Sequence, residues 1–86
     1  MEKPSTSTTP RLVFGRNLRL LRRLKDISQE DLALSANLSR TYVSEVERGV
    51  RNVSIDNMGL LADALGVGLK ELVDPEMRVS LQDHTR

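Results

Sequence analysis

The side chains best suited to specific recognition lie between Ser35 and Arg48. Four polar residues of this stretch recur at a spacing that places them on one face of a short helix: Arg40, Thr41, Ser44 and Glu45. An arginine can donate two hydrogen bonds to guanine O6 and N7, and a glutamate can accept one from cytosine N4. The pattern indicates recognition chemistry directed at the bases of DNA.

A capped helix is expected just before this stretch. Ser28 is a strong N-cap, and the carboxylate of Asp31 can reach back to form a capping box. The helix is predicted over Gln29 to Ala36. Its small Ala33 lets the following helix pack closely.

The bend and the next helix carry local signals of their own. Asn37 suits the bend because Asn, after Gly, best tolerates a positive φ. Ser39 then caps a helix predicted over Arg40 to Arg48, which Gly49 closes. Two helices joined in this way form a helix-turn-helix, in which the second helix protrudes and can enter a major groove.

Apolar residues at helical spacing predict three further helices. They are expected over Leu12 to Lys25, ended by Asp26, over Ile55 to Leu65 behind a Ser54 cap, and over Leu69 to Val73. The predicted core combines the inward positions: Phe14, Leu18, Leu21, Ile27, Leu32, Ala33, Val43, Val46, Ile55, Met58, Leu61, Ala62 and Leu65. The expected fold class is all-α, a compact five-helix domain.

Composition favours one small domain without catalysis. The 86 residues include no Cys and a single His, His84, so we expect no enzyme, metal site, cofactor or small-molecule ligand. The domain is predicted at 11–74, between a disordered arm at 1–10 and a tail at 75–86. The longest apolar stretch, Leu60 to Leu69, is too short to span a membrane, and a cytoplasmic location is expected.

Charge is distributed unevenly along the chain. From Arg11 to Arg51 there are nine Lys and Arg against five Asp and Glu, a net +4, and from Asn52 to Arg86 three against six, a net −3. The basic half suits a surface that faces phosphates, although a solvated face of the first helix would look the same.

Three motifs together resemble the lambda Cro/repressor-like (Xre) helix-turn-helix family, from Phe14 to Val73. They are Phe14-Gly-x-x-Leu-x-x-Leu-Arg22, Ile27-Ser-Gln-Glu-x-Leu-Ala33 and Leu38-Ser-x-x-Tyr-Val-Ser-x-Val-Glu-Arg-Gly49. The resemblance implies a lambda-repressor-like bundle of five helices. Departures are Asn37 where Gly is usual, Asp26 where Gly or Asn is common, and Gly59 inside a helix.

Arg40-Thr-Tyr42 followed by Glu47-Arg-Gly-Val-Arg-Asn-Val-Ser54 is similar to the controller proteins of restriction-modification systems. This similarity implies a dimeric regulator of its own promoter and that of an endonuclease. The implied roles are base readout by Arg40, Thr41, Ser44 and Glu45, and backbone contact by Gln29, Tyr42, Arg51 and Asn52. Glu45 is alternatively a solvated carboxylate, because it repels phosphate. Arg22 and Glu47 are implied to form a structural salt bridge.

A symmetric dimer is expected because one reading helix covers few base pairs and a small domain leaves apolar residues unburied. The candidate interface residues are Leu60, Val67, Leu69 and Val73, with the face of Leu20 and Leu24 as the alternative. The predicted function is transcription regulation by a homodimer on a pseudo-palindromic double-stranded DNA operator, with RNA polymerase as a further candidate partner. The competing hypothesis is a protein-interaction module, such as an antitoxin or adaptor.

Overall fold

The structure is a computed structural model that describes residues 9–78. This part of the chain forms five helices and no strand: α1 Pro10–Leu24, α2 Gln29–Ala36, α3 Arg40–Glu47, α4 Ile55–Leu65 and α5 Leu69–Val73. The prediction of an all-α, five-helix domain is thereby confirmed. Residues 1–8 of the expected arm and 79–86 of the expected tail lie outside the described residues.

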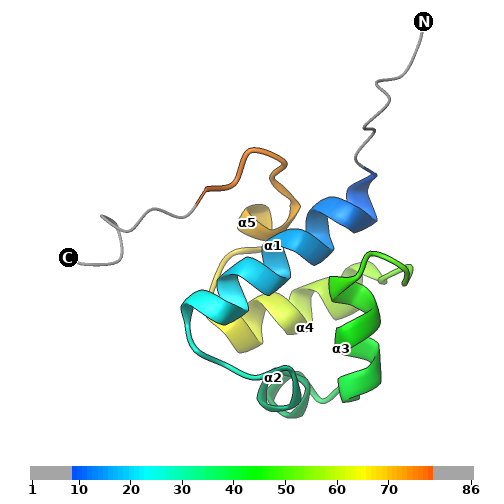
Figure 1. The fold of residues 1–86 in the computed structure, drawn as a ribbon, viewed down its shortest axis with the longest axis vertical. Coiled ribbons are helices and arrows are strands. Elements are labelled where there is room, and N and C mark those ends of the chain that lie inside the picture. The colour runs from blue at the N-terminus through cyan, green and yellow to red at the C-terminus, as the bar shows by residue number, and fades with distance from the viewer. Residues whose placement is uncertain (1–8, 79–86) are drawn as a thin grey trace, which may run out of the picture.

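The helices close a ring around one core. α1 packs against α3 and α5, α2 packs against α3 and α4, and α4 packs against α5 (Figure 1). The core contains most of the residues expected there, and also Val13, Ala36 and Leu72. Of the described helices, none is long and apolar enough to cross a membrane.

Ile55 corrects the predicted core. It was expected to point inward with Met58 and Leu61, yet it is 65% exposed. Ile55 is the first residue of α4, directly after the Ser54 cap. Helical spacing shows which residues share a face but not how far the neighbouring helices extend along it. The neighbouring helices leave Ile55, at the start of α4, exposed to solvent.

Hydroxyl side chains begin the first four helices. The serines at 28, 39 and 54 each accept a hydrogen bond from the backbone N–H three residues later. Thr9 does the same for α1, so Thr9 and Pro10 belong to the helical domain rather than to the arm. The capping box expected from Asp31 is half formed: Asp31 donates its N–H to Ser28 Oγ at 2.9 Å, but its side chain has no hydrogen bond back to the cap. An Asp side chain is one methylene shorter than that of the Glu usual at this position.

Two residues adopt the left-handed conformation that their short polar side chains tolerate. Asp26 has φ 60° after α1, and Asn37 has φ 62° at the bend between α2 and α3. Both positions were predicted from residue type. α3 ends at Glu47, with Arg48 as its C-cap and Gly49 at φ 75°, so the helix is one residue shorter than expected.

Gly15 sets the distance between α1 and α3. A Cβ added at Gly15 would lie 2.3 Å from the carbonyl oxygen of Val46 and 2.9 Å from that of Glu47. No side chain fits there without a shift of backbone. The absence of a Cβ thus lets the last turn of α3 rest directly on α1.

Asn17 holds α5 against α1 and is fully buried. Its Nδ2 lies 2.8–3.2 Å from the carbonyl oxygens of Glu71, Leu72 and Asp74, which are left without helical partners where α5 ends. Arg16 donates to the Asn17 Oδ1 and to the carbonyl of Pro75. The domain therefore extends past residue 74, the boundary expected from the sequence.

Candidate nucleic-acid interface

α3 presents a polar face to solvent while its other face is buried. Val43 and Val46 are 0% and 1% exposed, which fixes the rotation of the helix about its axis. On the opposite face Arg40 and Thr41 are exposed, and Ser44 and Glu45 are half-buried. The structure thus brings the four expected base-reading residues together on one outward surface.

A buried ion pair backs this surface. Arg22 of α1 donates from Nε to Glu47 Oε2 at 2.6 Å and from Nη2 to Oε1 at 3.1 Å. Its Nη1 donates to the carbonyl of Ile27 at 2.8 Å. The Glu47 side chain is 1% exposed and that of Arg22 is 11% exposed. This is the pair implied by the family resemblance, and it connects α1 to the last residue of α3.

Gln29 joins the same network from the start of α2. Its Nε2 donates to Glu47 Oε1 at 3.0 Å, so the expected backbone contact is also a support of the recognition helix. Only one of the two amide hydrogens is used in this way. The other hydrogen and the carbonyl oxygen are available to a ligand at the surface.

Beside Gln29 lies a hollow of about 520 Å³ at the N-terminus of α2. Three arginines line it, Arg22, Arg23 and Arg40, together with Ser28, Gln29 and Glu30. The free N–H groups and the dipole of a helix start favour an anion, and the arginines strengthen this preference. Glu30 is the one opposing charge among the lining residues.

A second polar cluster consists of Tyr42 and Glu45, both on α3, and Arg51, which follows the helix. The guanidinium of Arg51 lies 4.7 Å from the centre of the Tyr42 ring, and its Nε is 3.4 Å from Glu45 Oε1. The Tyr42 hydroxyl accepts a hydrogen bond from Asn57 of α4 at 3.0 Å. Tyr42 is therefore half-buried beside the outward face of α3, with its ring against Arg51 and its hydroxyl bonded to Asn57. Asn52, the remaining expected backbone contact, is exposed.

The expected dimer residues fall into two groups. Leu60 is 42% exposed and Val73 46% exposed, whereas Val67 and Leu69 are partly buried against the domain's own core. On the alternative face Leu20 is 42% exposed and Leu24 is half-buried. Of the four expected interface residues, Leu60 and Val73 are therefore the more exposed, and Leu20 on the alternative face is exposed to the same extent as Leu60.

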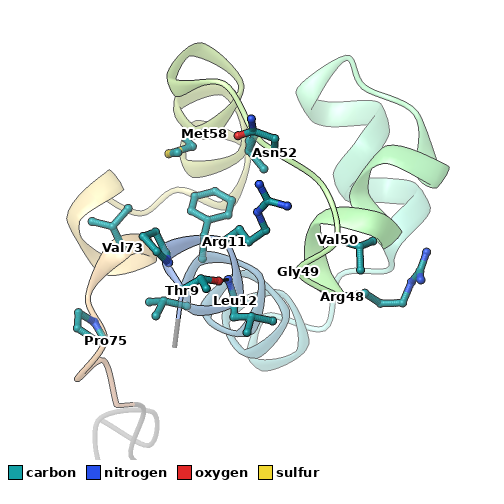
Figure 2. Close-up of a pocket in the computed structure, with 14 residues that line it drawn as sticks. Thr9, Arg11, Leu12, Arg48, Gly49, Val50, Asn52, Met58, Val73 and Pro75 are labelled. Atoms are coloured by element: carbon teal, nitrogen blue, oxygen red, sulfur yellow. Dashed lines mark hydrogen bonds between the residues drawn. The ribbon is translucent and has the colours of Figure 1, made fainter. Parts of the chain in front are cut away.

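An open hollow of about 830 Å³ lies away from these clusters, between the start of α1, the segment after α3, α4 and α5 (Figure 2). Leu12, Val50, Met58 and Val73 contribute apolar side chains to it, and Arg11 and Arg48 contribute the charged ones. Among the residues 9–78 that line it there is no carboxylate and no imidazole.

Two contributors to the site were missed by sequence reasoning. No role was assigned to Asn17 or to Asn57 from the sequence. A buried Asn at an inward helical position, one residue before Leu18, is a usable signal, because buried amides need partners. Nothing local pointed to Asn57, which meets Tyr42 only through the packing of α4 on the helix-turn-helix.

Comparison with known proteins agrees with this geometry. The Helix-turn-helix family matches residues 18–72 of the chain. The chain therefore belongs to the helix-turn-helix family of DNA-binding regulators.

The chain is similar to several restriction-modification control proteins. Control protein C.BamHI of Bacillus amyloliquefaciens is 51% identical over 65 residues, which are 74% of this chain and 80% of that protein. The crystal structure of the controller protein C.AhdI from Aeromonas hydrophila superimposes with a TM-score of 0.70 at 50% identity, covering 72% of this chain and 94% of that one. The C.Esp1396I tetramer in complex with its natural 35 base-pair operator matches with a TM-score of 0.72 at 29% identity, covering 84% and 100%.

Proposed function

We propose that this protein regulates transcription by binding an operator through the outward face of α3, controlling restriction-modification genes and its own promoter. The observation that carries the proposal is the polar face of α3, held from behind by the buried network of Arg22, Glu47 and Gln29. A rigid helix with an exposed polar face is the geometry that direct readout of a major groove requires. The relatives support the assignment to restriction-modification genes.

Arg40 is the proposed principal base reader. It is the first residue of α3, and in a helix-turn-helix the N-terminal residues of the second helix reach the base edges. Its side chain is exposed and can form two hydrogen bonds with guanine. Thr41 and Ser44 complete the reading surface on the same face.

The hollow at the start of α2 is proposed to hold a DNA phosphate. Gln29 and Arg23 supply donors there, and the helix N-terminus supplies a favourable dipole. A phosphate at this place would set the register of α3 in the groove. This contact carries no sequence information, so it contributes affinity to every duplex.

A homodimer is proposed to bind two half-sites. Leu60 and Val73 offer exposed apolar surface in the acidic second half of the chain, which would be repelled by phosphate. Paired half-sites would require the two α3 helices to lie about 34 Å apart, one turn of DNA. RNA polymerase remains a candidate partner at the promoter.

Footprinting on the DNA upstream of the protein's own gene tests this function. We expect protection of two half-sites, with affinity that falls steeply as salt concentration rises, since phosphate contacts release counterions. No retention of DNA even at low salt would favour the competing interaction module, and equal retention of a scrambled duplex at every salt concentration would refute sequence-specific regulation.

The dimer is tested by sedimentation of Leu60→Asp. This variant should sediment as a monomer and bind the operator with less cooperativity. Leu34→Asp is the matched control, because Leu34 lies on α2 and is 78% exposed. Wild-type sedimentation by Leu60→Asp would place the interface elsewhere, with the face of Leu20 the next to examine.

A further inference from the structure

The cluster of Tyr42, Glu45 and Arg51 has an unexpected charge arrangement for a surface that meets DNA. Glu45 lies on the outward face of α3, where its carboxylate would approach the phosphates. The structure gives it a cationic partner, since Arg51 Nε lies 3.4 Å from Glu45 Oε1. The two charges offset each other, so Glu45 weakens DNA binding less than an unpaired carboxylate would.

Two contacts restrain the guanidinium of Arg51, and a third holds one of its two partners. Glu45 engages it from the Nε side, the ring of Tyr42 lies 4.7 Å from its Cζ, and the Tyr42 hydroxyl is in turn anchored by Asn57 at 3.0 Å. Stacking on an aromatic ring and pairing with a carboxylate both restrict a flexible arginine. A phosphate contact does not need a restrained arginine, because phosphate oxygens accept hydrogen bonds from many directions. Discrimination between bases does need one, because the acceptors on a base edge have fixed positions.

Engagement from the Nε side leaves the end of the guanidinium available. Nη1 and Nη2 form a pair of parallel donors that matches the O6 and N7 acceptors of guanine. The Arg51 side chain is 45% exposed and that of Glu45 32% exposed, so the pair is reachable from solvent. Arg51 follows α3 in the chain and extends the reading surface beyond the helix's own eight residues.

We propose that Glu45 is a positioning residue that aims Arg51 at a base edge, and that Tyr42, Glu45 and Arg51 determine specificity as one unit. This inference rests on the proposed function. The proposal gives two residues roles other than those expected from the sequence. Glu45 acts through Arg51 instead of accepting a hydrogen bond from a base, and Arg51 contacts a base instead of the DNA backbone.

Glu45→Gln and Arg51→Lys test the proposal, singly and combined, in the full chain. A pool of duplexes with a randomised central segment first yields a preferred sequence for the wild type. Binding is then measured on every single-base variant of that sequence and on a scrambled duplex. Asp63→Asn is the matched control, since it also removes one negative charge from an exposed position, but on α4.

We expect Glu45→Gln and Arg51→Lys to lose preference at the same base pair, by about tenfold or more. Adding Glu45→Gln to Arg51→Lys should cause no further loss at that pair. Glu45→Gln should bind the scrambled duplex as tightly as wild type or more tightly, because the freed arginine can neutralise a phosphate and steepen the salt dependence. Both residues are partly exposed, and melting temperatures near that of wild type would exclude misfolding.

Three results would overturn the inference. Loss of preference at two different base pairs would make Glu45 an independent reader. Uniform weakening of all duplexes by Arg51→Lys would make Arg51 a phosphate contact, and an unchanged profile for Glu45→Gln would remove it from the site. Failure of the wild type to select any sequence would refute the proposed function itself, before any variant is compared.

Discussion

Replacing Arg22 with alanine should bring this domain close to unfolding. The change removes three hydrogen-bond donations: two to Glu47 and one to the carbonyl of Ile27. The Glu47 carboxylate, on a side chain that is 1% exposed, would keep only the amide of Gln29 at 3.0 Å and the more distant Arg19 at 4.0 Å. A nearly uncompensated charge would then be buried between α1 and α3.

The magnitude follows from burial. Breaking a buried ion pair by removal of one partner costs about 3–5 kcal/mol. A domain spanning residues 9–78 has a free energy of unfolding of roughly 3.5–10.5 kcal/mol. The loss is therefore a large fraction of the total, and it corresponds to a fall in Tm of roughly 12–40 °C.

Thermal and urea unfolding measure this effect, with Arg23→Ala as the matched control. Arg23 is the exposed neighbour on α1, and its removal should change stability by less than about 0.5 kcal/mol. Combining Arg22→Met with Glu47→Leu should recover most of the loss, because an apolar pair leaves no buried charge. The reasoning is refuted if Arg22→Ala melts within a degree or two of wild type, or if the double variant is no more stable than Arg22→Ala.

Four further substitutions test three separate features of the domain. Gly15→Ala should lower the free energy of unfolding in urea by about 1–3 kcal/mol, because the added Cβ would meet the Val46 carbonyl. Gly59 has open space around it, so Gly59→Ala should raise the free energy of unfolding by about 0.5–1 kcal/mol. Changes of the same sign in both variants would contradict this contact geometry. Asn17→Ala should cost about 1–3 kcal/mol and speed hydrogen exchange in α5, and unchanged exchange there would show that the amide does not hold this helix. Arg40→Ala should lose about 1–3 kcal/mol of preference at one operator position, and a uniform loss across a single-base panel would assign Arg40 to the backbone.

The helices were predictable because their ends are encoded locally. Ser28, Ser39 and Ser54 are N-caps whose partners lie three residues away, and Asn37 and Gly49 mark exits that need a positive φ. Such signals can be read without knowledge of the fold. Thr9 was missed although it is the same kind of cap, because it stands in a segment rich in Ser, Thr and Pro that resembles an arm.

The contacts that shape the candidate site depend on tertiary packing. Asn57 reaches Tyr42 only because α4 packs beneath the helix-turn-helix, and Arg51 reaches Glu45 only because the chain turns back after Gly49. Residue types and their spacing identified the outward face of α3. They could not show which residues from α4 or from the segment after α3 would contact that face. Glu45 illustrates the limit: it was predicted to read a base, with a solvated carboxylate as the alternative, and neither interpretation included Arg51 as its partner.

In the proposed function α1 has a larger part than its one proposed DNA contact, Arg23, suggests. Gly15 and Arg22, seven positions apart on α1, both meet the last turn of α3, Gly15 at the carbonyls of Val46 and Glu47 and Arg22 at the Glu47 carboxylate, and together they fix the position of that turn. Asn17, between them, fixes the end of α5, close to the proposed dimer residue Val73. Because a helix rises about 1.5 Å per residue, all three anchors lie within roughly 10 Å of one rigid rod. α1 thus holds both the last turn of α3 and the end of α5, and under the proposed function a substitution at one of these three anchors should alter half-site spacing or affinity.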